Sequence, residues 1–171
     1  MQVVILVGGL ATRLGDLTKN RPKSMVQVCG RPFLEYQLDF LKRTGIENIV
    51  LCIGYLGEQI ESHFGNGRQY GVNISYSHED KPLGTAGALK NAEALLEDTF
   101  FTIYGDSFVN LDFSRVMLSF NHQNKLALMT VYKNNKRFDK SNTEIEGKLV
   151  QRYSKKEPTS QTIYIDYGVN I

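Results

Sequence analysis

Short runs of apolar residues recur along the chain and are separated by longer segments that mix apolar and polar positions. Four of these runs, at residues 3–7, 49–53, 100–104 and 126–131, are unbroken and rich in β-branched or aromatic residues. Runs of this length and composition are typical of strands that are buried on both faces of a sheet. The pattern therefore predicts buried strands at these four places.

Between the first two predicted strands, Leu34, Leu38 and Leu41 recur with helical spacing. Pro32 suits the first turn of such a helix, and Gly45 can end it. Because predicted strands and helices alternate, we expect an α/β fold, a Rossmann-like three-layer sandwich with helices on both faces of a central sheet. Further helices are predicted at about 56–64, 85–96 and 113–122.

The pattern changes from Thr143 onward. The segments TEIEG, KLVQRYS and TIYIDYGVNI are typical of short strands, with no helix between them. The central sheet is therefore expected to be mixed and mostly parallel. No repeat or Pro/Gly-rich linker divides the chain, so residues 1–171 are expected to form a single domain. Because the last predicted strand stops at Ile171, we expect the chain to be truncated at its C-terminus.

The composition narrows the classes of function. The 171 residues are 42% hydrophobic and 22% charged, with a net charge of +2. We therefore expect neither a nucleic-acid surface, which needs a broad basic field, nor a membrane protein. The first apolar run is too short to span a membrane and lacks the basic leader of a signal peptide. Cys29 and Cys52 are expected to be buried free thiols, and the protein to be cytoplasmic.

The first predicted strand ends in two glycines, within the segment VGGLATRLGDLTKNRPKSM at residues 7–25. A glycine-rich turn after a strand exposes backbone N–H groups and lets a phosphate chain approach closely. The spacing matches neither a P-loop nor a dinucleotide fingerprint, so the glycines alone leave a structural turn open. The cations that follow favour an anion site, and they are Arg13, Lys19, Arg21, Lys23 and Arg31.

Four sequence blocks occur in the order found in a known enzyme family. They are GGLATRL with PKSM, PLGTAGAL at residues 82–89, YGDS at residues 104–107, and SNTEIEGKLVQRYSKK ending at Lys156. Together they resemble the sugar-1-phosphate nucleotidyltransferases, most closely the D-glycero-D-manno-heptose-1-phosphate guanylyltransferase branch. Ala11 and Ser24 depart from the usual Gly and Pro without removing a charge. The resemblance covers nearly the whole chain and implies a glycosyltransferase-A-like nucleotidyltransferase fold.

In this family a sugar-1-phosphate oxygen attacks the α-phosphorus of a nucleoside triphosphate, and pyrophosphate leaves. Because that oxygen is already anionic, the resemblance implies cations and a metal rather than a general base. Arg13 and Lys23 match the family's catalytic arginine and lysine, and Lys23 also bridges to the sugar phosphate. The alternative interpretation is that Arg13 and Lys23 are only exposed cations on a loop. The implied nucleotide-binding residues are Leu6, Gly8, Gly9, Thr12, Arg13, Glu79, Gly84, Thr85 and Gly105.

Glu79 stands where relatives carry a Gln or Glu that reads the edge of the base. An ionised carboxylate only accepts hydrogen bonds. Guanine offers two adjacent donors, N1–H and the N2 amino group, whereas uracil offers one donor between two carbonyls that would repel a carboxylate. The sequence therefore favours GTP. The alternative is that Glu79, in the charged run HEDK, is solvated.

Asp106 follows the predicted strand at 100–104 and one glycine. A carboxylate at the C-terminal end of a buried strand lies where α/β sheets bind ligands, and it readily holds Mg²⁺ together with phosphate oxygens. The resemblance implies that Asp106 is a Mg²⁺ ligand, and the alternative is that it caps the next turn. The family's second metal aspartate has no match in residues 1–171.

The sugar side follows the family less closely. The resemblance implies that Lys156 binds the sugar phosphate, but Lys155 stands where the family usually has a glutamate. Asp166 and Gly168 lie in IDYGV, the segment that usually reads NAGIY and contacts the sugar. An equally favoured interpretation is that Asp166 and Gly168 only form a turn at the end of a strand. These departures favour a heptose 1-phosphate as substrate.

The sequence thus predicts an enzyme that transfers a nucleoside monophosphate, with GMP favoured, from GTP or another triphosphate to a sugar 1-phosphate. GDP-heptose is the favoured product. A mannose-1-phosphate guanylyltransferase, a uridylyltransferase and a non-catalytic nucleotide-sugar-binding regulatory subunit stay open as alternatives. The predicted partners are the two substrates and Mg²⁺, with no nucleic acid and no membrane, and homo-oligomer formation is left open.

Overall fold

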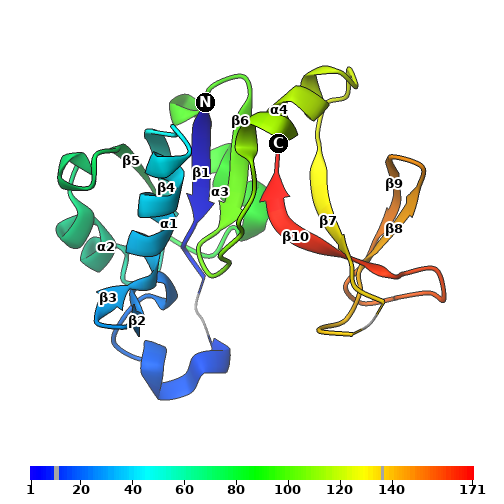
Figure 1. Ribbon diagram of the computed structural model, residues 1–171. Coiled ribbons are helices and arrows are strands. Elements are labelled where there is room, and N and C mark those ends of the chain that lie inside the picture. The colour runs from blue at the N-terminus through cyan, green and yellow to red at the C-terminus, as the bar shows by residue number, and fades with distance from the viewer. Residues whose placement is uncertain (10–11, 136) are drawn as a thin grey trace. The chain divides into compact units, whose positions relative to one another are not determined.

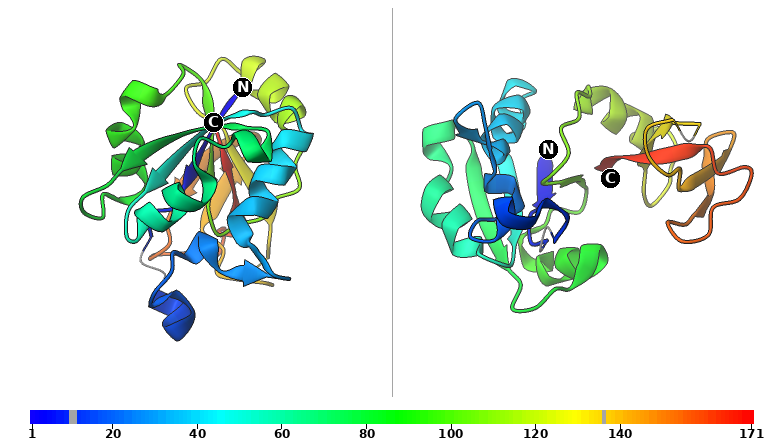
Figure 2. Two further views of the ribbon diagram at one scale, coloured as in Figure 1. Left: turned by 90° about the vertical axis from the view of Figure 1, so that its left-hand side faces the viewer. Right: turned by 90° about the horizontal axis from the view of Figure 1, so that it is seen from below.

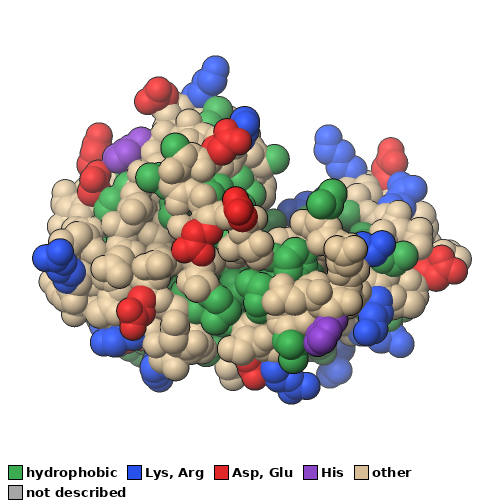
Figure 3. Space-filling model, turned by 90° about the horizontal axis from the view of Figure 1, so that it is seen from above, with side chains coloured by type: hydrophobic (Ala, Val, Ile, Leu, Met, Phe, Trp, Pro, Cys, Tyr) green, Lys and Arg blue, Asp and Glu red, His purple; other side chains and the backbone are tan. Residues whose placement is uncertain are grey.

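The structure is a computed structural model that describes residues 1–9, 12–135 and 137–171 (Figure 1). The chain divides into two compact units, Met1–Phe113 and Ser114–Ile171, and each is described by itself. That all 171 residues form one domain stays a prediction. Among the described residues, no helix combines the length and the apolar composition of a membrane span. Basic and acidic side chains are interspersed on the face drawn in Figure 3.

The first unit contains a parallel sheet in which the strand order is β5-β4-β1-β6. Leu6, the last residue of β1, lies beside Cys52 of β4 and Tyr104 of β6. The chain segments that leave β1 and β6 therefore begin at the same edge of the sheet. These strands are β1 (Gln2–Leu6), β4 (Asn48–Ile53), β5 (Asn73–His78) and β6 (Phe100–Tyr104).

Three strands of this sheet were predicted, and β5 was missed. β1, β4 and β6 are almost entirely buried, as expected of strands covered on both faces. In β5, exposed Asn73 and Ser75 alternate with buried Ile74. β5 pairs only with β4 among the described residues, so fewer of its positions need apolar side chains. The polar residues hid this strand from a search for unbroken apolar runs.

Helices cover both faces of the first unit's sheet, which confirms the α/β, three-layer arrangement. Figures 1 and 2 show α1 and α3 on opposite faces. On the α3 face, Val4, Val50 and Cys52 pack against Ala88 and Ala92. The helices are α1 (Phe33–Arg43), α2 (Gly57–Phe64) and α3 (Gly84–Asn91), and α3 is followed by the short 3-10 helix η4 (Glu93–Leu95).

A short hairpin connects the glycine loop to α1. Cys29 and Gly30 form its tip, both with positive φ (49° and 79°). Cys29 is exposed, so the expectation of two buried thiols was wrong for this residue, because a two-residue turn projects from the surface. Cys52 is buried and free, and burial, together with the nearby Glu79 carboxylate, raises the pKa of its thiol to about 12. The remaining elements of this region are η1 (Thr12–Thr18), η2 (Lys23–Met25), β2 (Gln27–Val28), β3 (Arg31–Pro32) and η3 (Arg68–Tyr70).

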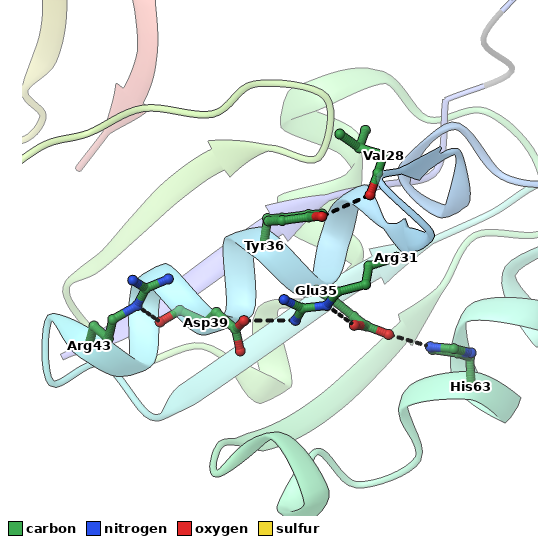
Figure 4. Close-up of polar contacts among 7 residues, drawn as sticks. All are labelled: Val28, Arg31, Glu35, Tyr36, Asp39, Arg43 and His63. Carbon is green, nitrogen blue, oxygen red and sulfur yellow. Dashed lines mark hydrogen bonds and ion pairs between the residues drawn. The ribbon is translucent and has the colours of Figure 1, made fainter.

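A polar network fixes the hairpin to α1 and α2 (Figure 4). Arg31 donates hydrogen bonds to Glu35 (2.8 Å) and Asp39 (2.7 Å), and His63 Nε2 lies 2.9 Å from the second oxygen of Glu35. Burial alone would raise the pKa of Glu35, but the hydrogen bonds from His63 and Arg31 outweigh it and lower that pKa. Arg31 therefore belongs to a structural network that links the hairpin to α1.

The second unit is an antiparallel sheet with the order β7-β10-β8-β9. Together with the parallel strands of the first unit, it gives the chain both kinds of pairing, as predicted for a mixed sheet. The buried strand predicted at 126–131 was wrong in position and burial. Leu126 is fully exposed, and the residues of β7 are half-buried or exposed, because an antiparallel strand needs only one covered face. The strands are β7 (Met129–Lys133), β8 (Thr143–Glu146), β9 (Leu149–Tyr153) and β10 (Tyr164–Asn170), and α4 (Phe113–Asn121) begins at the boundary of the two units.

Candidate active site

A cavity of about 390 Å³ lies in the first unit, where the chain leaves β1 and β6. The C-terminal edge of parallel strands is the usual ligand site of such sheets, because the loops there diverge. Four parts of the chain line it. They are the end of β1 with the residues after it, η2, the β5–α3 connection with α3 itself, and the end of β6 with the residues after it. The lining residues are Leu6, Val7, Gly8, Gly9, Lys23, Ser24, Glu79, Pro82, Gly84, Thr85, Ala88, Tyr104, Gly105 and Asp106.

Opposite charges meet in this cavity. Lys23 Nζ of η2 forms an ion pair with Asp106 Oδ2, just after β6. About a third of each side chain is exposed (32% and 38%), and pairs with this exposure contribute only about 0–1 kcal/mol to stability. An anion and a cation that enter the cavity can therefore replace this pair at little cost.

Glu79 is held in a defined orientation. Its Oε2 accepts a hydrogen bond from the backbone N–H of Leu83 (3.1 Å), and its own N–H donates to Ile53 O (2.8 Å). A Cβ atom at Gly8 would lie 2.9 Å from Glu79 Oε1, so the carboxylate occupies space that only a glycine leaves open. The half-buried Glu79 is therefore an oriented acceptor on the cavity wall rather than a freely solvated side chain.

Gly105 is required by the close approach of β6 to β1. Its N–H donates to Leu6 O (3.0 Å), and a Cβ there would overlap Val7 Cγ1 and lie 3.0 Å from Leu6 O. Gly84 has a different requirement, because its φ of +72° is strained for a residue with a side chain. At both positions the backbone itself forms part of the cavity wall, and a residue with a side chain would disturb this arrangement.

Ser24 lines the cavity and was not predicted as a site residue. Its side chain is nearly inaccessible (2% exposed), and its Oγ has no hydrogen-bond partner among the described residues. The family pattern has proline here, so the sequence marked Ser24 only as a departure. Val7, Pro82, Ala88 and Tyr104 were also missed as site residues, although each stands inside one of the sequence segments quoted above.

Asp106 is the cavity residue best suited to hold a metal ion. In the described residues, no group of three or more His, Cys, Asp or Glu side chains is placed to bind one. Mg²⁺, however, keeps several waters and is usually bound by one or two carboxylates together with substrate phosphates. A single carboxylate on a cavity that can admit phosphates fits this mode of binding.

Five of the predicted site residues are not among those that line the cavity. Thr12 and Arg13 belong to η1, but their side chains are not among the described parts of the structure. Lys156, Asp166 and Gly168 belong to the second unit. Lys156 is exposed after β9, and Asp166 Oδ1 accepts a hydrogen bond from Gly168 N (2.8 Å) at the irregular point of β10. The functions assigned to these five residues stay predictions.

Comparison with known proteins bears on the chemistry of this cavity. The family model described as nucleotidyl transferase matches residues 2–142, which include every residue that lines the cavity. The chain belongs to the nucleotidyl transferase family. The family resemblance read from the sequence is thus confirmed.

Among nucleotidyl transferase relatives are two D-glycero-alpha-D-manno-heptose 1-phosphate guanylyltransferases. The one from Campylobacter jejuni is 38% identical over 119 residues, which cover 70% of this chain and 53% of the relative. The one from Aneurinibacillus thermoaerophilus is 39% identical over 132 residues, covering 75% and 57%. The matched region thus spans little more than half the length of these relatives.

The crystal structure of HddC from Yersinia pseudotuberculosis complexed with GMP-PN has a similar fold. Its TM-score is 0.81 at 29% sequence identity, and the match covers 99% of this chain and 75% of that chain. The Rossmann-like α/β fold of a nucleotidyl transferase is therefore shared along essentially the whole of this chain.

Proposed function

We propose that this nucleotidyl transferase moves GMP from GTP to a sugar 1-phosphate, with a heptose 1-phosphate as the favoured acceptor, and releases pyrophosphate. The observation that carries the proposal is that Lys23, Asp106 and Glu79, which come from three distant segments, line one cavity. They supply a cation for phosphate, a carboxylate for a metal and an acceptor for a base. The names of the two guanylyltransferase relatives support guanosine and heptose as the substrate groups.

The triphosphate would lie against the glycines that follow β1. Gly8 and Gly9 line the cavity, and a Cβ at Gly9 would meet no heavy atom within 4 Å. Backbone N–H groups there can approach phosphate oxygens without side-chain interference. Thr12 and Arg13, further along the loop, are proposed to complete this binding segment.

The reaction needs charge stabilisation more than proton transfer. The attacking sugar-phosphate oxygen is anionic, so the barrier comes from bringing two phosphates together in line. Lys23 would lie between the α-phosphate and the sugar phosphate and reduce their repulsion. Arg13 is proposed to bind oxygens of the leaving pyrophosphate with its planar guanidinium group as negative charge develops there.

Asp106 is proposed to hold Mg²⁺ together with the phosphates. When bound, Mg²⁺ neutralises phosphate charge and orients the triphosphate for in-line attack. Lys23, which now pairs with Oδ2 of this carboxylate, would find a new anionic partner in the phosphates. The ion pair between Lys23 and Asp106 supports this proposal, because it brings the two groups together at the cavity.

Glu79 is proposed to select guanine. Because one carboxylate oxygen is already held by Leu83 N–H, the group is oriented before the nucleotide enters. A carboxylate can accept from N1–H and the N2 amino group of guanine together, and charged hydrogen bonds of this kind contribute about 1.5–3 kcal/mol each. Leu6, Gly84 and Thr85 would contact the base and ribose from the neighbouring walls.

Lys156, Asp166 and Gly168 are proposed to bind the sugar phosphate and sugar. Lys156 supplies a second cation for the acceptor phosphate, and the Asp166–Gly168 turn offers a carboxylate and backbone groups for sugar hydroxyls.

GTP and sugar phosphates are soluble intracellular metabolites, so we propose that the protein works in the cytoplasm.

Product analysis tests this function directly. The protein is incubated with GTP, Mg²⁺ and D-glycero-α-D-manno-heptose 1-phosphate, and pyrophosphate and sugar nucleotide are measured by chromatography with mass spectrometry. Equal amounts of GDP-heptose and pyrophosphate are expected, and neither without the sugar phosphate. Tight GTP binding without either product would instead identify a non-catalytic binding protein.

A further inference from the structure

Gln37 of α1 contacts the segment that carries Asp106. Its side chain is 3% exposed, and its Nε2 donates hydrogen bonds to two backbone oxygens, Tyr104 O (2.9 Å) and Ser107 O (2.7 Å). These two carbonyl groups stand on either side of Gly105 and Asp106. One buried amide therefore holds both ends of a four-residue segment whose third residue is Asp106.

The segment is a turn that depends on these bonds. Ser107 N donates to Tyr104 O (3.2 Å), which closes a turn with Gly105 and Asp106 at its centre. The Gln37 amide group has two hydrogens, and each carbonyl takes one. Because both partners are acceptors, the orientation of the amide follows from its contacts. Loss of the amide would leave Ser107 O without this donor and weaken the attachment of the turn to α1.

The other end of the Gln37 side chain shows that packing alone does not explain the residue. Gln37 Oε1 is buried and has no hydrogen-bond partner among the described residues. An unsatisfied buried oxygen destabilises a protein, whereas an apolar side chain of similar volume would not carry that cost. A glutamine here is therefore suited to its two donor contacts rather than to filling space.

A second contact runs from the same face of α1 to the same loop. Phe40, one turn after Gln37, packs against Phe108 with ring centroids 5.5 Å apart. Phe108 is the first residue beyond the turn. Helix α1 thus supports the loop by a polar contact at the turn and an apolar contact next to it.

We propose that Gln37 is a positioning residue for Asp106. It holds the Tyr104–Ser107 turn so that the Asp106 carboxylate lies beside Lys23 at the cavity, in the place where the proposed function requires a metal ligand. The inference rests on that proposed function. Groups that orient a metal ligand typically change metal affinity by 10- to 100-fold when they are removed.

Metal binding in the protein tests the proposal without relying on activity. Mn²⁺ is the probe, its binding is followed by electron paramagnetic resonance, and a non-hydrolysable GTP analogue is present at saturation. Gln37→Leu should weaken Mn²⁺ binding by about tenfold or more. Gln37→Met, which is unbranched like glutamine and also lacks the donors, should give the same result and serves if the leucine variant does not fold.

Leu38→Val is the matched control. Leu38 is the next residue of α1, is fully buried, and packs in the core instead of donating to the turn. Loss of one buried methylene group there should lower the stability to an extent comparable with the loss of one hydrogen bond. It should leave Mn²⁺ affinity unchanged.

Hydrogen–deuterium exchange gives a readout of the turn itself. In the Gln37 variants, the backbone amides of residues 105–108 should exchange faster than in the wild-type protein. In Leu38→Val the same amides should exchange at the wild-type rate. If Mn²⁺ affinity and exchange match those of the Leu38→Val control, or if neither Gln37 variant folds, the positioning role is wrong. The variant Asp106→Asn distinguishes failure of the positioning role from failure of the proposed function. A normal Mn²⁺ affinity in Asp106→Asn would refute the metal site of the proposed function itself.

Discussion

Lys23 and Asp106 are 83 positions apart in the sequence and form an ion pair at the wall of the cavity. The pair joins the end of the glycine loop to the turn after β6. Each group is proposed to act on a different part of the substrate complex, one on phosphate and the other on a metal. The ion pair thus places the two charges that the proposed function needs next to each other at the cavity.

Replacement of Lys23 should affect turnover far more than nucleotide binding. In Lys23→Met the side chain keeps its length but loses the charge that would stabilise the approach of two phosphates. Loss of one such preorganised group typically lowers kcat by about 10²- to 10³-fold. The Kd for GTP, measured by calorimetry, should rise less than tenfold.

Lys90→Met is the control for this change. Lys90 is exposed on α3 and pairs with Glu93 (2.6 Å), away from the cavity wall. In Lys90→Met, the kcat and the Kd for GTP should stay at the wild-type values. Equal losses of binding and turnover in Lys23→Met would mean that the lysine only binds ligand.

Much of this site could be predicted because its residues belong to contiguous motifs. Gly8, Gly9, Lys23, Glu79 and Asp106 each stand in a short block, and all of them line the cavity. Such motifs can be read locally because the chain leaves successive parallel strands at one edge. The roles of these residues still depend on ligands and stay proposals.

Residues whose importance comes from distant partners were not predicted. Gln37 lies in an amphipathic helix among Leu34, Leu38 and Leu41, where a glutamine is indistinguishable from a surface residue. Its two acceptors are carbonyl groups of the backbone 67 and 70 positions away, and backbone acceptors carry no sequence signal. Strand β5 was missed for a related reason, because its exposed positions are polar.

Glu79→Gln should reduce discrimination in favour of guanine. An amide can still accept from one guanine donor, but its NH2 group opposes the other and can instead donate to a uracil carbonyl. The ratio of kcat/KM for GTP to that for UTP should fall by about 10- to 100-fold, the equivalent of one charged hydrogen bond. Steady-state kinetics with the two triphosphates measures it.

Gly8→Ala gives an independent check on Glu79. The new Cβ would lie 2.9 Å from Glu79 Oε1, so the carboxylate must move although its charge is unchanged. The same ratio should therefore fall in this variant. An unchanged ratio in both variants would show that Glu79 does not select the base.

Gly105→Ala should destabilise the protein. Its Cβ would overlap the buried Val7 side chain and approach Leu6 O at 3.0 Å, and overpacking of this kind costs about 1–3 kcal/mol. Urea unfolding should show a lower midpoint with an unchanged slope. Gly9→Ala, whose Cβ meets no atom within 4 Å, should keep the wild-type midpoint. Equal midpoints for both variants would contradict the close contact of β6 with β1.

Glu35 should make the stability depend on acidic pH. Hydrogen bonds from His63 and Arg31 outweigh the effect of burial and lower its pKa in the folded protein below the ordinary value of 4.5. Folding therefore favours the ionised form. This stabilisation is fully present above pH 4.5 and is lost as the pH falls through the lower folded-state pKa.

Glu35→Gln should remove that contribution. The free energy of unfolding at pH 7 should fall by about 1 kcal/mol, the upper value for an ion pair with an exposed partner, and its decrease between pH 6 and pH 3 should become smaller. Urea titrations across this range measure both. Glu93→Gln, at an exposed ion pair, is the control, and an identical pH profile for wild type and Glu35→Gln would rule out the assigned role.

A substrate competition tests the central claim most directly. The protein is given D-glycero-α-D-manno-heptose 1-phosphate, Mg²⁺ and equal concentrations of GTP and UTP, and the two sugar nucleotides are separated and quantified. GDP-heptose should form in at least tenfold excess over UDP-heptose, the result expected if the Glu79 carboxylate accepts hydrogen bonds from guanine. An excess of UDP-heptose, or no sugar nucleotide at all, would contradict a guanylyltransferase.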